Sequence, residues 1–179
     1  LESISREKLQ RKQLSFSKSR VRSRVHRLAY PDYVEVKAYN NDGEVLGLHR
    51  FMGLYTFNVY SMSPDLIPIL RRKVAQVMTM SELDGREHDG RELARVLETF
   101  PRDELFQSSI GELHETAQSV NRIQERPQTR LFIRRDIHGK FFNCLVYIPR
   151  DSYSTELRVL IQDILVKALE AQEAEFTTQ

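Results

Sequence analysis

The sequence predicts an α+β fold in which two antiparallel hairpin-plus-helix units are joined by a helical segment. Three observations support this class. Turn-forming residues twice separate short runs of alternating hydrophobicity, at "NNDG" (40–43) and at His138-Gly139. A helix signal follows each hairpin. Between the two units, residues 89–126 show the spacing of helices and not of strands. This order of elements argues against a doubly wound sheet.

Composition restricts the class of protein further. The 179 residues are 40% hydrophobic and 29% charged, enough for one modest core or two small ones. No apolar run approaches eighteen residues and the chain opens without a signal peptide, so we expect a cytoplasmic protein without a membrane contact. Cys144 is the only cysteine, which excludes an internal disulfide and a cysteine-built zinc site. The missing initiating Met suggests part of a longer chain.

Charge is distributed unevenly along the sequence. Residues 1–28 carry nine Lys and Arg against two Glu, whereas the remainder carries eighteen against twenty-three acids. The first 18 residues are therefore expected to form a basic, flexible arm. Residues 6–27 offer an alternative function, a basic module that binds nucleic acid, but aromatic side chains are nearly absent from them and we do not favour it.

The first unit is expected to contain a strand over 19–27, where Ser and Val alternate with basic residues. A hairpin over 33–57 follows, and its glycines suggest bulges. Ser63-Pro64-Asp65 then has the residue types of a helix N-terminus, which predicts a helix over 64–79.

The connecting segment predicts two helices. Asp89 and Glu92 resemble a capping box for the first, and Pro101 ends it. The second should run over 103–126. Its apolar residues form a narrow seam that suits one neighbouring helix, and we expect this seam to serve as a subunit contact; the seam comprises Phe106, Ile110, Leu113, Ala117 and Val120.

The second unit begins with a hairpin over 130–148. Its second strand, "FFNCLVYI", is almost continuously apolar, which predicts a central strand covered on both faces. Ser154 should cap a helix over 154–171 that covers one side of the sheet.

Motifs of catalysis are missing from the sequence. Its glycines form neither G-x-G-x-x-G nor a P-loop, and its serines lack the G-x-S-x-G turn. "HETAQ" (114–118) has Gln118 where a zinc motif needs its second His. We therefore expect no catalytic, cofactor-binding or metal-binding residue in this chain.

Three stretches carry a resemblance to a known family: "RVHRLAYPDYVEVKAYNNDGEVLGLHRFMGLYT", "ETFPRDELFQ" and "RLFIRRDIHGKFFNCLVYIPRDSYSTELRVLIQDIL". They resemble the amino-terminal region of the large bacterial NAD-specific glutamate dehydrogenases, from about Arg20 to Gln179. The resemblance implies four parts: a flexible arm (1–18), a PAS-like sheet and helix (19–80), a helical connector (81–127) and a partial ACT-like, ferredoxin-like module (128–179). It also implies that "EFTTQ" starts a further strand.

The same resemblance implies a non-catalytic role. The parent enzyme converts L-glutamate to 2-oxoglutarate and ammonia with NAD, but none of its catalytic or NAD-binding residues maps onto this chain. The expected role is regulation and oligomerisation, with the parent's catalytic domain and further copies as partners, through the helix seam and exposed strand edges. An amino-acid effector is a further expected partner; its candidate contacts are Arg134, Arg135, Asp136, Asp151, Ser152 and Tyr153. The competing interpretation of these six is that they make only cross-strand and cap interactions.

Overall fold

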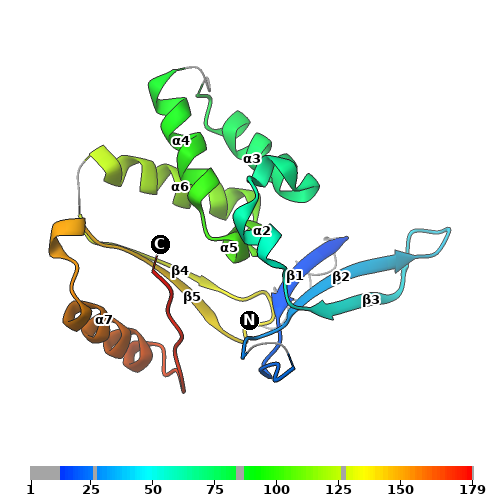
Figure 1. The fold of residues 1–179 in the computed structure, drawn as a ribbon. Helices are drawn as coiled ribbons and strands as arrows, with labels where there is room; N and C mark the ends of the chain where they lie inside the picture. The colour runs from blue at the N-terminus through cyan, green and yellow to red at the C-terminus, as the bar shows by residue number, and fades with distance from the viewer. Residues whose placement is uncertain (1–12, 26–27, 84–86, 126–127, 179) are drawn as a thin grey trace.

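The computed structural model describes residues 13–25, 28–83, 87–125 and 128–178. It confirms the α+β class, with two small antiparallel sheets and several helices. Helices α3 to α6 gather in one cluster, the three-stranded sheet lies to one side of it, and the second hairpin with α7 lies to the other (Figure 1). Residues 1–12 of the predicted arm lie outside the described part of the chain.

The N-terminal sheet contains β1 (Leu14–Lys18), β2 (Asp32–Tyr39) and β3 (Val45–Gly53) in that order, all antiparallel. The predicted hairpin is confirmed. Asn40 Oδ1 accepts hydrogen bonds from the backbone N–H groups of Asp42 and Glu44, and Gly43 has a φ of 83°, so the turn uses the residue types that made it recognisable. The register shifts beside Gly47, where a bulge was expected.

The predicted first strand was wrong. The strand lies at 14–18, so the end of the predicted flexible arm belongs to the sheet, and residues 19–25 make only one isolated bridge, between Ser23 and Ala29. Val21 and Val25 are 73% and 83% exposed. Phe16 packs against the ring of Phe106 instead. An aromatic side chain buries more apolar area than a valine, so its packing determines which segment pairs.

The helical unit comprises α3 (Pro68–Met80), α4 (His88–Thr99) and α6 (Ile110–Glu125), which surround the main core. Helix α3 begins later than expected, because Pro68 cannot donate inside a helix. A 3-10 turn, η1 (Pro64–Leu66), and a short helix, α2 (Phe57–Ser61), precede it. The core residues of these helices are Leu70, Val77, Leu93, Val96, Leu97, Leu113, Ala117 and Val120.

Two predictions in this region were wrong. Asp89 does not cap α4, whose N-cap is Glu87 without a side-chain bond. The single helix over 103–126 is broken into α5 (Arg102–Gln107) and α6. Ser109 and Glu112 form a reciprocal capping box at the break: the Ser109 N–H donates to Glu112 Oε2 (2.8 Å) and the Glu112 N–H to Ser109 Oγ (3.2 Å).

The apolar seam of α6 does not face a partner. Leu113, Ala117 and Val120 are at most 3% exposed because α3 and α4 of the same chain cover them. The predicted subunit contact through this seam is therefore wrong: the seam is part of the core of the chain itself.

The C-terminal hairpin pairs β4 (Arg130–Arg135) with β5 (Phe142–Tyr147), and Gly139 in its turn has a φ of 66°. The 3-10 turn η2 (Arg150–Ser152) and helix α7 (Thr155–Ala168) follow, and Ser154 caps α7 as predicted by accepting from the Leu157 N–H (3.1 Å). The strand β5 was expected to be central, but in the described chain it pairs only with β4. The segment "EFTTQ" was expected to start a further strand, but its described residues, 175–178, join no strand ladder. Gln162 and Arg158 of α7 hold this tail through Ala174 and Phe176.

Candidate functional site: a junction helix between three units

The short helix α5, "RDELFQ", lies where the N-terminal sheet (β1–β3), the helical unit (α3, α4, α6) and the C-terminal hairpin (β4–β5) meet. We call it the junction helix. Asp103 and Glu104 in its first turn suit the positive end of a helix dipole. Glu104, Leu105 and Phe106 are three consecutive buried residues. Consecutive positions point in different directions from a helix, so burial of all three means that different parts of the chain surround it.

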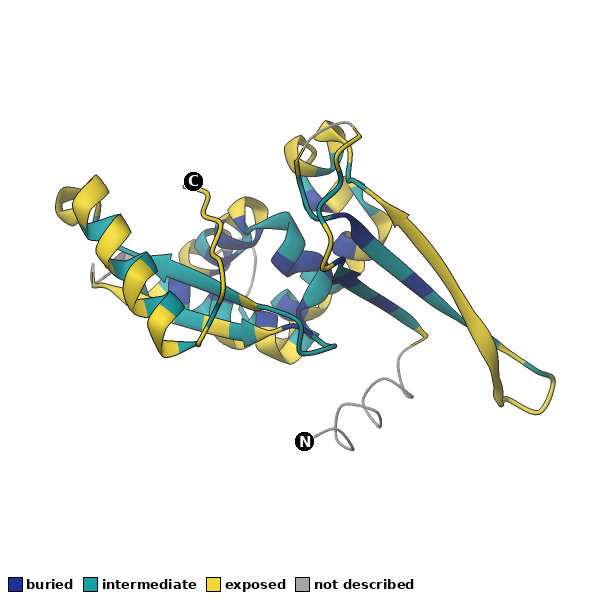
Figure 2. Cartoon of the chain, turned by 90° about the horizontal axis from the view of Figure 1, so that it is seen from below, coloured by how far each residue is buried: buried dark blue, intermediate teal, exposed yellow. Residues whose placement is uncertain are grey.

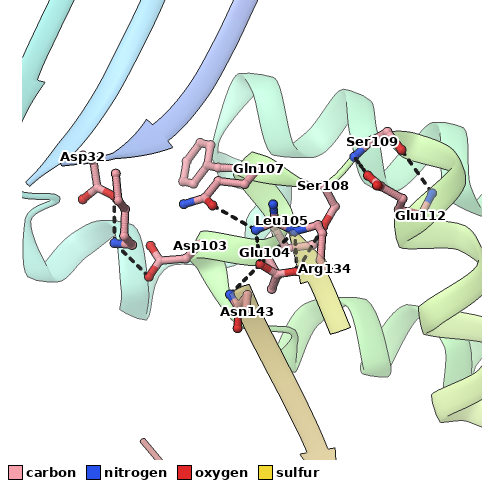
Figure 3. Close-up of polar contacts among 12 residues, drawn as sticks. Asp32, Asp103, Glu104, Leu105, Gln107, Ser108, Ser109, Glu112, Arg134 and Asn143 are labelled. Atoms are coloured by element: carbon pink, nitrogen blue, oxygen red, sulfur yellow. Dashed lines mark hydrogen bonds and ion pairs between the residues drawn. The ribbon is translucent and has the colours of Figure 1, made fainter. Parts of the chain in front are cut away.

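Glu104 connects the junction helix to the C-terminal hairpin. Arg134 of β4 donates from Nε to both Glu104 carboxylate oxygens, at 3.1 and 2.9 Å, and from Nη2 to Oε1. Asn143 of β5 also donates to the carboxylate, and Gln107 accepts a second bond from Arg134 at 2.9 Å (Figure 3). The partners come from both strands of the hairpin, so this one carboxylate determines how the hairpin sits on the helices.

The Glu104–Arg134 pair is largely removed from water, with side chains 5% and 11% exposed. Burial opposes the charge of Arg134, but the hydrogen bonds and charge of Glu104 outweigh it and raise the pKa of the guanidinium above its ordinary value. Bidentate pairing of this kind is geometrically specific. The pair therefore holds one orientation between α5 and β4.

Asp103 connects the junction helix to the N-terminal sheet through Lys18, the last residue of β1. The Lys18 Nζ lies 3.1 Å from Asp103 Oδ2 and 2.9 Å from Asp32 Oδ1 of β2. Figure 3 labels the two carboxylates. Burial would lower the pKa of Lys18, but the two carboxylates outweigh it and raise that pKa. Burial also raises the pKa of Asp32, against the effect of Lys18, so desolvation offsets much of this contact. It specifies geometry more than it adds stability.

The helical unit holds the other end of the junction helix. Lys73 of α3 donates to the carbonyls of Leu105 and Phe106, both at 2.7 Å, where a cation complements the last carbonyls of a helix. The Phe106 ring lies 5.0 Å from the ring of Phe16 in β1 and 5.0 Å from that of Tyr55. Apolar packing and hydrogen bonds thus position the same six residues.

A second polar contact joins the hairpin turn directly to the N-terminal sheet. Glu35 of β2 is 2% exposed and lies 2.7 Å from Arg50 and 3.4 Å from His138. Ser15 also donates to it. Burial opposes ionisation of Glu35, but the hydrogen bond and charge of Arg50, with His138 and Ser15, outweigh it and lower the pKa of this carboxyl. The turn therefore rests on a charged group that stays ionised.

The six predicted effector contacts are not brought together. Arg134 is committed to Glu104, and Asp136 Oδ2 accepts from the backbone of His138 and Lys140 within the turn. Arg135 lies over the ring of Phe142. The remaining three, Asp151, Ser152 and Tyr153, are exposed at the opposite end of the hairpin, after β5.

Sequence reasoning did not identify Glu104 or Glu35 as important. Glu104 follows Asp103 just after Pro101, where acids are common at a helix start, so nothing marked it as a buried partner of Arg134. Glu35 occupies an ordinary alternating position of a strand.

Among the described residues, no group of three or more His, Cys, Asp and Glu side chains could hold a metal ion. Cys144 is half-buried, and burial raises the pKa of its thiol. No helix in the described ranges is long and apolar enough to cross a membrane. Two cations of the basic segment 6–27, Lys18 and Arg22, form ion pairs within the chain, and Arg22 contacts Glu173 and Glu175.

Comparison with known families gives two matches, which adjoin one another along the chain. Residues 67–126 match glutamate dehydrogenase, helical motif 1, and residues 130–179 match the glutamate dehydrogenase ACT2 domain. The junction helix lies in the first segment and Arg134 in the second. The ion pair between Glu104 and Arg134 therefore links two segments that the family comparison separates.

Curated relatives share the similarity over almost the whole chain. NAD-specific glutamate dehydrogenases from Pseudomonas aeruginosa and Halomonas elongata are 51% and 47% identical to it over 165 residues, 92% of the chain. The protein of that name from Mycobacterium tuberculosis is 39% identical over 170 residues, 94% of the chain. The chain spans about a tenth of the length of each of these relatives.

Proposed function

The chain belongs to the large NAD-specific glutamate dehydrogenases, and from this premise we propose that it is a non-catalytic regulatory and assembly segment of such an enzyme. The parent enzyme would oxidise L-glutamate to 2-oxoglutarate and ammonia with NAD, on a catalytic domain outside this chain. The PAS-like assignment of residues 19–80 and the cytoplasmic location are parts of the same proposal.

The junction helix is the single observation that carries this proposal. Six consecutive residues bind a sheet, a helical unit and a hairpin, and the hairpin belongs to the ACT2 segment. A rigid connector of this kind transmits a shift of the hairpin to the helices. Glu104 cannot keep its bonds to Arg134 and Asn143 if the junction helix and the hairpin separate. Regulation by such a device requires that an effector bind one arrangement more tightly than the other.

Effector binding by the ACT2 segment is the finer part of the proposal. Arg135, Asp151, Ser152 and Tyr153 keep side chains available at the two ends of the hairpin, whereas Arg134 and Asp136 would act through the position of the hairpin. These two ends are separate, so one bound amino acid would contact either Arg135 or the loop of Asp151, Ser152 and Tyr153, and the effector part of the proposal is supported mainly by the match to the ACT2 domain. We propose that the effector is an amino acid, with the substrate L-glutamate among those to be tried.

The first experiment separates the segment from the catalyst. The purified 179-residue chain should form no NADH from glutamate and NAD, whereas the full-length enzyme should. Calorimetry of the chain with arginine, aspartate and glutamate then tests effector binding directly. NADH formation by the chain alone would disprove the non-catalytic assignment, and absence of heat with all three amino acids would remove their binding from the proposal.

The second experiment tests coupling in the full-length enzyme. In Glu104→Gln, the amino-acid concentration that gives half of the maximal change in rate should differ from the wild-type value by at least about threefold. This corresponds to a change in coupling free energy of ~0.7 kcal/mol. Glu92→Gln, an acid of α4 that contacts only Arg95 among the described ion pairs, is the matched control and should leave the response unchanged. A wild-type response in Glu104→Gln would show that the junction helix does not couple the units.

A further inference from the structure

The edge strand β3 lacks the features that normally protect an unpaired edge strand from association. All nine of its residues are exposed, including Leu46, Leu48, Phe51 and Met52 (Figure 2). Natural edge strands are kept short or carry Lys, Pro or inward-pointing charge, because an unpaired row of N–H and C=O groups templates association. Residues 45–53 contain no Lys, Pro, Asp or Glu. The opposite edge, β1, is five residues long and half-buried.

The side chains of β3 also differ from those of a strand in a sheet with one solvent-exposed face, where only one side of the strand is apolar. Leu48 and Met52 lie on the side of Glu35, and Phe51 lies on the side of Val34 and Phe16, as the cross-strand register requires. Apolar residues on both sides are typical of an interior strand, which is covered on both faces and paired on both edges.

We propose that β3 is an interior strand whose second neighbour is an extended segment from elsewhere in the full-length polypeptide. This rests on the proposed function, which places the chain in an enzyme about ten times as long. The neighbour should pair along most of 45–53, carry apolar residues on both sides, and lack Lys and Arg where it crosses His49 and Arg50, since like charges opposite each other destabilise a sheet.

Two other occupants fit less well. Within the described chain, the extended segment 172–178 is held against α7 through Ala174 and Phe176, far from β3 (Figure 1). Residues 1–12 carry four cations and no alternating apolar pattern. A second copy, pairing β3 with β3, would satisfy the edge, but overlap along most of 45–53 would place its own His49 and Arg50 beside those of the first copy, the like charges that a neighbour should lack.

Hydrogen exchange compares β3 in the two settings. In the full-length enzyme the amides of 45–53 that point away from β2 should exchange at least about tenfold more slowly than in the 179-residue chain. Equal rates in the two settings would overturn the proposal. Protection in the chain alone that grows with concentration and reaches the full-length level would assign the edge to a second copy, which also overturns it.

A matched pair of variants makes the test specific. Leu48→Lys should accelerate exchange of β3 in the full-length enzyme by about tenfold and leave it unchanged in the isolated chain, where the site is already exposed. Met80→Lys is the control, because Met80 and Leu48 are 49% and 47% exposed, and it should change neither. Exchange of β3 is read without activity, so loss of the proposed effector response leaves this pairing standing and the two proposals fail separately.

Discussion

At the scale of single residues, Glu104 connects the junction helix to both strands of the C-terminal hairpin, although no motif in the sequence marks it. Its carboxylate binds Arg134, thirty residues later in the chain, and Asn143 on the neighbouring strand, and it does so inside the protein. Burying two charges costs desolvation energy, which their attraction repays only with good geometry. The pair is therefore better explained as a device that specifies orientation than as a source of net stability.

Replacing Glu104 by Gln should lower the free energy of unfolding of the chain by about 3 kcal/mol, because Arg134 remains buried without its counter-charge. Urea denaturation measures this. The double variant Glu104→Leu with Arg134→Met should recover most of the loss, since neither buried charge remains. If Glu104→Gln cost as little as the surface variant Glu92→Gln, the pair would not hold the hairpin in place.

Because of Glu35, the stability of the chain should decrease at acidic pH. Its pKa in the folded chain lies below the ordinary value of 4.5, so its contribution is complete above that pH and is lost as pH falls through the folded value. The difference in unfolding free energy between wild type and Glu35→Gln should therefore be largest near pH 5.5 and shrink toward about pH 3. Denaturation at both pH values tests this, and a difference that grew in acid would contradict it.

At the scale of elements, the break between α5 and α6 shows how a local motif can be overlooked within a longer pattern. The apolar spacing continues through Ser108 and Ser109, and that continuity predicts one helix. The capping box of Ser109 and Glu112 starts a new helix instead, and Glu104 receives a bond from Ser108 Oγ (3.3 Å) at the corner. The corner turns α5 away from α6 and leaves it free to contact both sheets.

Ser109→Ala removes one half of this capping box and should destabilise the chain by about 1 kcal/mol, since the Glu112 N–H loses its acceptor. Ser61→Ala is the control: its hydroxyl donates to the Phe57 carbonyl four residues earlier on an exposed helix, and it should cost less than about 0.5 kcal/mol. Thermal unfolding distinguishes the two. Equal effects would mean that the capping box contributes nothing specific.

Helix α7 illustrates the opposite case: the helix was predicted correctly, but its apolar face is only partly covered. The helix forms as predicted, but on its apolar face Leu160 and Ile164 stay exposed beside the half-buried Leu157, Ile161 and Leu165. A sheet of two strands is too narrow to cover the whole stripe of a helix. The helix therefore forms from local signals, while the extent of its burial depends on the width of the sheet.

At the scale of the whole molecule, Phe106 is the apolar counterpart of Glu104. Its ring contacts Phe16 of the N-terminal sheet and Tyr55 of the segment after β3, while its carbonyl accepts from Lys73 of the helical unit. Asp103 and Glu104, which form ion pairs, precede it in the same short helix. The three units thus meet around an apolar centre with charged contacts at its margin.

Phe106→Ala should destabilise the chain by about 3 to 5 kcal/mol through loss of buried ring area and the cavity that remains. It should also accelerate hydrogen exchange in β1 more than in α4, because Phe16 of β1 loses its partner ring, whereas α4 packs mainly against α3 and α6. Uniform acceleration across both elements would indicate global destabilisation without a specific role at the junction.

The sequence by itself determined the elements whose signals are local. Asn40 to Gly43 and His138-Gly139 placed both hairpin turns, Ser154 placed the start of α7, and the lack of nucleotide-binding and nucleophile motifs argued against an active site. Turn and cap geometry depends on a few neighbouring residues, so the residue types alone carry the information.

Tertiary structure alone decided the rest. It selected 14–18 as a strand in place of 19–25, the described part of the predicted strand, placed the apolar seam of α6 inside the chain, and paired Glu104 with Arg134 across thirty positions. Each of these outcomes depends on which surfaces meet after folding, and a periodic pattern is the same whether its apolar side meets a partner chain or its own core. Packing over long sequence separation, more than local preference, makes α5 a junction.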